Sequence, residues 1–249
     1  MARPVALVTG GGQRLGAAIV EELINDGWYV LVHVRNSVEQ ATQNIAAIGK
    51  KLGKHPSLIA DILIADLADI DGVNSLAESV VEHPMVDAAG GLAGLVHNAS
   101  FYSHIEFKEL SDSDIAEQCH LHLTVPIILT QVLSGLLANA QGAVVGMLDT
   151  SHGKAWGGLT HYTSTKAALR QALISMSKEL APAIRVNGVS PGAILPADWE
   201  ESSFREIIRS VPLGRAGTPQ DIANAVKFML TSPYVTGQIL AVDGGWSIN

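Results

Sequence analysis

Apolar residues in this chain occur in two arrangements that alternate from one end to the other. Short unbroken runs rich in valine and leucine predict strands at 4–8, 28–34, 57–65, 92–96, 142–148, 185–189 and 238–242. Apolar residues at helical spacing predict helices near 17–24, 38–52, 72–82, 111–140, 161–180 and 219–230, with a kink or break at Pro126. This alternation predicts an α/β fold, with one doubly wound, seven-stranded parallel sheet and helices on both faces. We interpret residues 1–249 as a single domain.

The composition excludes several classes of protein. Hydrophobic residues make up 47% of the 249 residues and charged residues 16%, which excludes a disordered chain. The net charge of −8 and the lack of a basic stripe argue against a nucleic-acid partner. Cys119 is the only cysteine, so we expect no disulfide framework and no metal site. No apolar run reaches eighteen residues and no signal peptide is evident, so we expect no membrane association and a cytoplasmic location.

A glycine-rich turn, Thr9 to Gly16, joins the first predicted strand to the first predicted helix. Glycines let backbone N–H groups approach a phosphate, and the helix N-terminus adds partial positive charge. The turn reads T-G-x-x-x-R-x-G and misses the G-x-G-x-x-G fingerprint, because Leu15 stands at its last position. We predict nucleotide binding at Gly10, Arg14, Leu15 and Gly16. A glycine turn without a ligand is the alternative.

The residues after the second predicted strand decide which dinucleotide is recognised. They run from His33 to Ser37, include Arg35 and Asn36, and contain no carboxylate. A site for NAD places Asp or Glu here to hold the ribose 2′-hydroxyl, whereas a positive charge with amide or hydroxyl donors suits the 2′-phosphate of NADP. We therefore predict NADPH as the cofactor, with Arg14 adding a second charge. A solvated arginine at a strand end is the alternative.

Polar segments also end the third and fourth predicted strands. Asp66 and Leu67 could meet the adenine ring through the carboxylate and the next backbone N–H group, and a helix cap is the alternative for Asp66. Asn98, Ala99 and Ser100 are small enough to pass close to the cofactor ribose.

Tyr162 and Lys166 carry the sharpest chemical signal. At positions i and i+4 they share one face of a helix that follows the fifth predicted strand. A nearby ammonium favours the phenolate, so the pair can move a proton beside a hydride transfer.

These motifs, together with Arg185-Val186-Asn187, Ser190-Pro191-Gly192 and Thr236-Gly237…Asp243-Gly244-Gly245, resemble the short-chain dehydrogenase/reductase family over essentially the whole chain. Arg14, His33, Asn98-Ala99-Ser100 with Phe101, and Asp149 are most similar to its pteridine reductase group, which includes dihydromonapterin reductases. The resemblance implies a Rossmann fold, NADPH, reduction of a pterin ring and a homotetramer. It implies catalysis by Asp149, Tyr162 and Lys166, and cofactor binding by the residues above together with Tyr162, Lys166, Pro191 and Gly192. It implies that the substrate is bound by Arg14, Ser100, Phe101, Asp149 and Tyr162.

Two positions depart from the wider family. The family serine lies thirteen residues before the tyrosine, and here that position is Asp149 rather than Ser151. The family's helix asparagine, part of its proton relay, is His122, for which a helix-packing role is the alternative. The first departure supports a pteridine reductase. The second puts the usual relay in doubt.

Aromatic residues and one long connection complete the predicted substrate site. Phe101 is a candidate stacking platform for a flat heterocycle, and a core or lid aromatic is the alternative. Tyr102, Trp156 and Trp199 could also line the site, and residues 195–212 occupy the place of the family's substrate lid. The leading hypothesis is therefore an NADPH-dependent reductase of a dihydropterin or dihydrofolate. A ketone reductase and a non-catalytic NADPH sensor are the alternatives.

Overall fold

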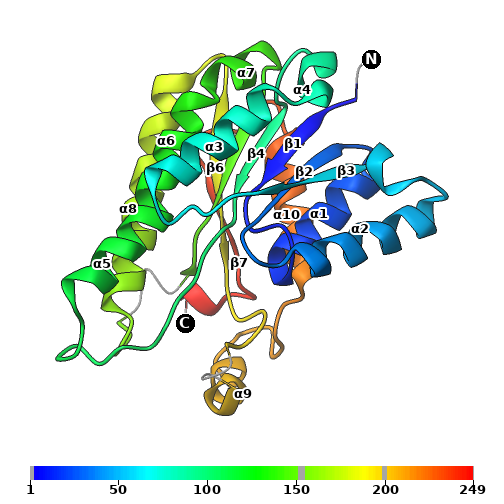
Figure 1. Cartoon of the computed structure of the whole chain (residues 1–249). Helices are drawn as coiled ribbons and strands as arrows, with labels where there is room; N and C mark the ends of the chain where they lie inside the picture. The colour runs from blue at the N-terminus through cyan, green and yellow to red at the C-terminus, as the bar shows by residue number, and fades with distance from the viewer. Residues whose placement is uncertain (1–2, 151–154, 198–200, 249) are drawn as a thin grey trace.

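The computed structural model describes residues 3–150, 155–197 and 201–248, and within them seven strands form one parallel sheet (Figure 1). The strands are β1 (Val5–Val8), β2 (Tyr29–Val34), β3 (Ala60–Ile64), β4 (Gly94–His97), β5 (Ala143–Met147), β6 (Arg185–Pro191) and β7 (Ile239–Val242). Their order is β3-β2-β1-β4-β5-β6-β7, and every neighbouring pair is parallel. The predicted sheet is thus confirmed.

Both faces of the central strands β1, β2, β4 and β5 are buried, as their unbroken apolar runs require. Ala6 and Val8 of β1 pack in a core with α1 (Arg14–Asn25), α2 (Val38–Leu52) and α10 (Pro219–Thr231). Val5 and Leu7 point the other way, into a core with α3 (Ile70–Val81), α6 (Val125–Val132) and α8 (Thr160–Leu180). The period-2 alternation of a strand therefore divides one four-residue run between two cores.

Several element boundaries differ from the sequence prediction. Residues 56–58 form a 3₁₀ turn, η1 (Pro56–Leu58), so the third strand is shorter than the predicted 57–65. Two helices were not predicted, α4 (Pro84–Ala89), which begins with a proline after His83, and α9 (Glu201–Arg209) in the predicted lid. α4 has only six residues, which carry little periodic signal. In α9 the apolar residues Phe204, Ile207 and Ile208 do follow helical spacing, but they lie in the segment interpreted as a lid.

The long helical pattern at 111–140 is divided into four parts. They are α5 (Asp112–Cys119), the π-helical turn η2 (His120–Thr124), α6 and α7 (Ser134–Asn139). The predicted break at Pro126 is present as η2, which ends just before it. A proline donates no backbone hydrogen bond, so the helix in front of it is free to widen.

The strand order reverses between β1 and β4, which lie side by side although far apart in sequence. The chain leaves β1 for α1 on one face of the sheet, and leaves β4 toward α5 and α6 on the other. This divergence opens a crevice beyond the carboxyl ends of the strands, the position where doubly wound sheets bind ligands. No helix in the three described ranges has the length and apolarity needed to cross a membrane.

Candidate active site

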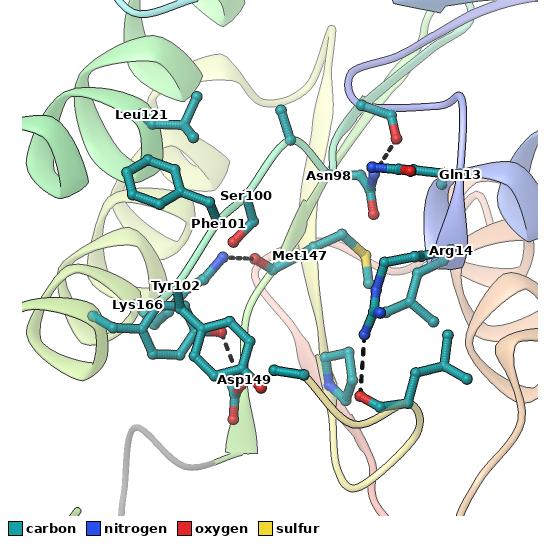
Figure 2. A pocket seen from close by; sticks show the side chains of 18 of the residues that line it. Gln13, Arg14, Asn98, Ser100, Phe101, Tyr102, Leu121, Met147, Asp149 and Lys166 are labelled. Atoms are coloured by element: carbon teal, nitrogen blue, oxygen red, sulfur yellow. Dashed lines mark hydrogen bonds between the residues drawn. The ribbon is translucent and has the colours of Figure 1, made fainter. Parts of the chain in front are cut away.

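A cavity of about 1240 Å³ lies at this crevice (Figure 2), and Phe204 and Ile207 of α9 contribute to its lining. It is walled by the segments that follow β1 to β6 and by the first turns of α8. All residues of the predicted cofactor and substrate site line it: Gly10, Arg14, Leu15, Gly16, His33, Arg35, Asn36, Ser37, Asp66, Leu67, Asn98, Ala99, Ser100, Phe101, Asp149, Tyr162, Lys166, Pro191 and Gly192. The fold thus brings them together, while their individual roles stay predictions.

The glycine turn leaves no room for side chains on its inner side. A Cβ atom on Gly16 would lie 2.1 Å from the carbonyl oxygen of Gly10, and one on Gly10, whose φ is +63°, would lie 3.0 Å from Cα of Ala99. The Asn98 amide donates to the carbonyls of Thr9 and Gly10, both at 3.0 Å. The ends of β1 and β4 are therefore held together as one rigid surface.

His33, a predicted cofactor-binding residue, forms two hydrogen bonds with the backbone. Its Nδ1 accepts from the Gly10 N–H group at 3.2 Å, and its Nε2 donates to the Ala65 carbonyl at 3.1 Å. Burial lowers the pKa of His33, and because Nδ1 accepts a hydrogen bond it carries no proton, so the ring is neutral. His33 thus braces the glycine turn against the ends of β2 and β3, and it brings no positive charge to the cavity.

Arg35 supplies the charge at the end of β2. Its guanidinium is 61% exposed and lies 3.8 Å from the Asp66 carboxylate. Asp66 also accepts from the Ala68 N–H group at 3.0 Å. The helix-cap interpretation of Asp66 is wrong, because α3 is capped by Asp69, whose carboxylate accepts from Gly72 at 2.9 Å.

Arg14 makes contacts that the sequence did not predict. Its guanidinium donates to the carbonyls of Leu195 at 3.2 Å and Pro196 at 3.0 Å, in the connection after β6 (Figure 2). Arg14 also adopts φ +50°, a left-handed conformation that is unusual for a residue with a side chain. The glycine turn is therefore tied directly to the start of the predicted lid.

Asp149, Tyr162 and Lys166 all line the cavity. Figure 2 labels Asp149 and Lys166 on the wall across from Arg14. The Tyr162 hydroxyl donates to Oδ2 of Asp149 at 2.8 Å, and Lys166 Nζ donates to the Met147 carbonyl at 3.0 Å. Lys166 Nζ lies 5.6 Å from the centre of the Tyr162 ring. Burial lowers the pKa of Lys166 to about 8, and the Asp149 carboxylate opposes that shift. A proton-bearing phenol, a carboxylate and an ammonium thus face the same space.

Aromatic side chains form much of the remaining wall. Phe101 is 44% exposed, and the ring centres of Tyr102 and Tyr162 lie 5.0 Å apart. Trp156 packs on Trp246, with 5.6 Å between the ring centres. Trp199 and Ser151 lie outside the described residues.

Other lining residues were missed by the sequence reasoning. They include Gln13, Glu117, His120, Leu121, Phe204, Ile207 and Trp246. Gln13 is a variable position of the glycine-rich turn, and the others except Phe204 and Ile207 reach the cavity only through packing. Phe204 and Ile207 lie within the predicted lid and, with Ile208, have the spacing of one helical face, which could have suggested them.

The donor set fits a dinucleotide. A cradle that a Cβ atom would fill can accept a phosphate closely, Arg35 can pair with a second phosphate, and the segment from Asn98 to Ser100 leads from the cradle to Tyr162. The residues present therefore suit a phosphorylated nucleotide whose reactive end lies near Asp149.

Comparison with known proteins identifies the family. A family model described as enoyl-(acyl carrier protein) reductase matches residues 12–247. The chain belongs to the short-chain dehydrogenase/reductase family. It is 31% identical to a 3α-hydroxysteroid dehydrogenase of Mediterraneibacter gnavus, over 96% of this chain and 95% of that protein. It is 30% identical to a dihydromonapterin reductase of Citrobacter koseri, with the same two coverages of 96% and 95%.

The fold agrees with the sequence comparison. The crystal structure of the FolM alternative dihydrofolate reductase 1 of Brucella canis, complexed with NADP, superimposes with a TM-score of 0.87 at 30% identity, over 100% of this chain and 95% of that one. The chain is therefore an oxidoreductase of the short-chain family. The names of its relatives include both pterin and alcohol chemistry.

Proposed function

We propose that this protein is an NADPH-dependent reductase of a pterin ring, converting a dihydropterin or dihydrofolate to its tetrahydro form. The observation that carries the proposal is the hydrogen bond of 2.8 Å from the Tyr162 hydroxyl to Asp149, where the wider family has a serine. The resemblance to dihydromonapterin reductase and to the FolM enzyme complexed with NADP supports it.

The predicted cofactor residues fall into groups that would bind different parts of NADPH. Arg35, Asn36 and Ser37 would take the 2′-phosphate, and the turn from Gly10 to Gly16 would take the diphosphate. NADPH, when bound, supplies a hydride to the substrate carbon. The segment from Asn98 to Ser100 would hold the ribose on the nicotinamide side.

Tyr162, Asp149 and Lys166 would deliver the proton that the reduction requires. Reduction of a C=N bond places a hydride on carbon and requires a proton on nitrogen. Tyr162 holds that proton at Oη, and Asp149 orients the hydroxyl through Oδ2. The carboxylate can also accept from N–H and amino groups on the polar edge of a pterin, which serine cannot do with a charge. The Lys166 ammonium stabilises the phenolate that remains after the proton has left.

A ketone reductase is the second candidate. The 3α-hydroxysteroid dehydrogenase relative and the aromatic lining of the cavity favour it. A non-catalytic NADPH sensor is disfavoured, because it has no need of the Tyr162 and Lys166 arrangement. We also propose, from family resemblance alone, residues 195–212 as a substrate lid and a homotetramer. The cytoplasmic location expected from the sequence is likewise a proposal.

The deciding experiment measures NADPH oxidation with dihydropterins, dihydrofolate and simple ketones for the parent and for Asp149→Ser. We expect Asp149→Ser to lose most dihydropterin reduction, at least about tenfold, because the charge-assisted contact is gone. Ketone reduction should fall less or rise, and the NADPH dissociation constant should be unchanged. Equal rates of dihydropterin reduction by both proteins would favour the ketone reductase hypothesis. No turnover of any compound would favour the non-catalytic sensor.

A further inference from the structure

His122 lies directly behind the cavity wall, on the π-helical turn η2, and is 1% exposed. Its Nε2 is 2.8 Å from Oγ of Ser100, which lines the cavity, and its Nδ1 is 3.1 Å from Oγ1 of Thr165 on α8. The imidazole meets the Tyr162 ring edge-on, with 5.6 Å between the ring centres. π-Helical turns are rare and are frequently found at functional sites. Here the π-helical turn η2 places a histidine between two hydroxyl groups.

The proton positions in this chain of groups follow from its ends. The Thr165 hydroxyl donates to the Tyr162 carbonyl at 2.8 Å, so its oxygen is left to accept from His122. Burial, together with the nearby charges of Lys166 and His161, lowers the pKa of His122 to about 2. The neutral ring therefore has one proton, which lies on Nδ1. Its Nε2 is an acceptor, and the Ser100 hydroxyl donates to it.

We propose that His122 is a positioning residue that fixes the Ser100 hydroxyl so that only its lone pairs face the cavity. The wall at Ser100 then takes an N–H or O–H donor from a bound molecule and disfavours a carbonyl. Two molecules carry such donors: the nicotinamide half of the cofactor, through ribose hydroxyls and carboxamide, and a pterin, through ring N–H and amino groups. Only the second source rests on the proposed function. A ring that stays neutral has no second proton to deliver, so His122 orients groups rather than acting as an acid.

The tautomer can be tested without substrate or cofactor. Protein labelled with ¹⁵N-histidine should show His122 with a protonated Nδ1 and a bare Nε2 between about pH 6 and pH 8, assigned by the loss of that signal in His122→Gln. A protonated Nε2, or a ring that gains charge in this range, overturns the proposal. This result is independent of what the enzyme reduces.

The functional test compares His122→Phe, which removes both hydrogen bonds, with His122→Gln, whose amide oxygen can replace the Nε2 acceptor. We expect His122→Phe and Ser100→Ala each to weaken ligand binding about 3- to 10-fold, the effect of one neutral hydrogen bond. The double variant should be no weaker than Ser100→Ala, and His122→Gln should recover most of the loss. An increased NADPH dissociation constant identifies the cofactor as the donor. An increased KM for dihydropterin at unchanged NADPH affinity and kcat identifies the substrate.

Threonine variants provide a matched control. Thr165→Val and Thr130→Val each remove a buried hydroxyl bonded to a buried histidine, and Thr130 pairs with His97 Nε2 at 2.8 Å rather than with His122. Thr165→Val should weaken ligand binding as His122→Phe does, whereas Thr130→Val should lower the unfolding temperature alone. Three results would each refute the positioning role of His122. They are equal losses of ligand binding in Thr165→Val and Thr130→Val, additive effects of His122→Phe and Ser100→Ala, and no change in any binding constant.

Discussion

At the scale of single residues, the Tyr162 hydroxyl has a defined partner, and one substitution can remove it without removing the ring. Tyr162→Phe keeps the ring and its packing but removes the hydroxyl group, whose oxygen lies 2.8 Å from Oδ2 of Asp149. We expect kcat to fall at least about 100-fold, because general acid catalysis is lost, while NADPH affinity stays nearly unchanged. Stopped-flow NADPH oxidation and fluorescence titration measure the two quantities. Near-normal turnover would remove this tyrosine from the mechanism.

Arg35 belongs to the same scale, because we propose that this one side chain at the end of β2 sets the preference for NADPH over NADH. A charge-assisted contact to the 2′-phosphate contributes about 1.5–3 kcal/mol, so NADPH should bind at least about tenfold more tightly than NADH. Arg35→Ala should remove most of that preference by weakening NADPH binding alone. Lys54→Ala, which removes the same charge outside the cavity lining, is the control and should leave the preference intact. Equal dissociation constants in the parent protein would contradict the assignment.

At the scale of elements, α1 can bind a phosphate only while its first turn stays against β1 and β4. Gly16→Ala places a methyl group 2.1 Å from the Gly10 carbonyl, which forces the turn to move. We expect at least about a tenfold loss of NADPH affinity, since the contact is made to backbone and cannot relax cheaply. Isothermal calorimetry with NADPH measures it.

A second helical glycine is the matched control for this element. A Cβ atom on Gly135 in α7 would meet nothing within 4 Å, so Gly135→Ala should leave NADPH affinity unchanged. It should also raise the free energy of unfolding by about 0.5–1 kcal/mol, because alanine loses less backbone entropy in a helix. Undiminished NADPH binding by Gly16→Ala would show that the cradle does not contact the cofactor.

At the scale of the whole molecule, burying Lys166 reduces the stability of the fold in return for a poised ammonium. Its pKa is about 8 in the folded protein against 10.5 for an ordinary lysine, so folding disfavours the charged form. The cost is fully present below about pH 8 and disappears as the pH rises above 10.5, because the unfolded chain binds the extra proton between these values.

Lys166→Met tests that cost. At pH 7 we expect the variant to be more stable than the parent by about 3 kcal/mol, and by about 1 kcal/mol at pH 10, although it is inactive. Urea unfolding at the two pH values measures the difference. A gap that is constant with pH would show that the ammonium is not the destabilising group.

The local features of this protein are determined by its sequence. Strand and helix periods predict the parallel sheet, because residues buried on both faces must be apolar. The spacing of Tyr162 and Lys166 places them on one helical face. These inferences need only neighbouring residues and the direction of parallel strands. The six residues of α4 are too few to carry the same signal. The approach of Asp149 to Tyr162 is implied by the resemblance to the family, whose serine occupies that position.

The tertiary structure alone decides how each polar group is used. Arg14 contacts carbonyls 181 and 182 residues away, His122 joins residues 22 and 43 positions away, and His33 is neutral between two strand ends. No local pattern encodes these contacts, because they depend on where packing brings distant segments. Proton positions depend on burial in the same way, so the neutral state of His33 and His122 follows from the completed fold.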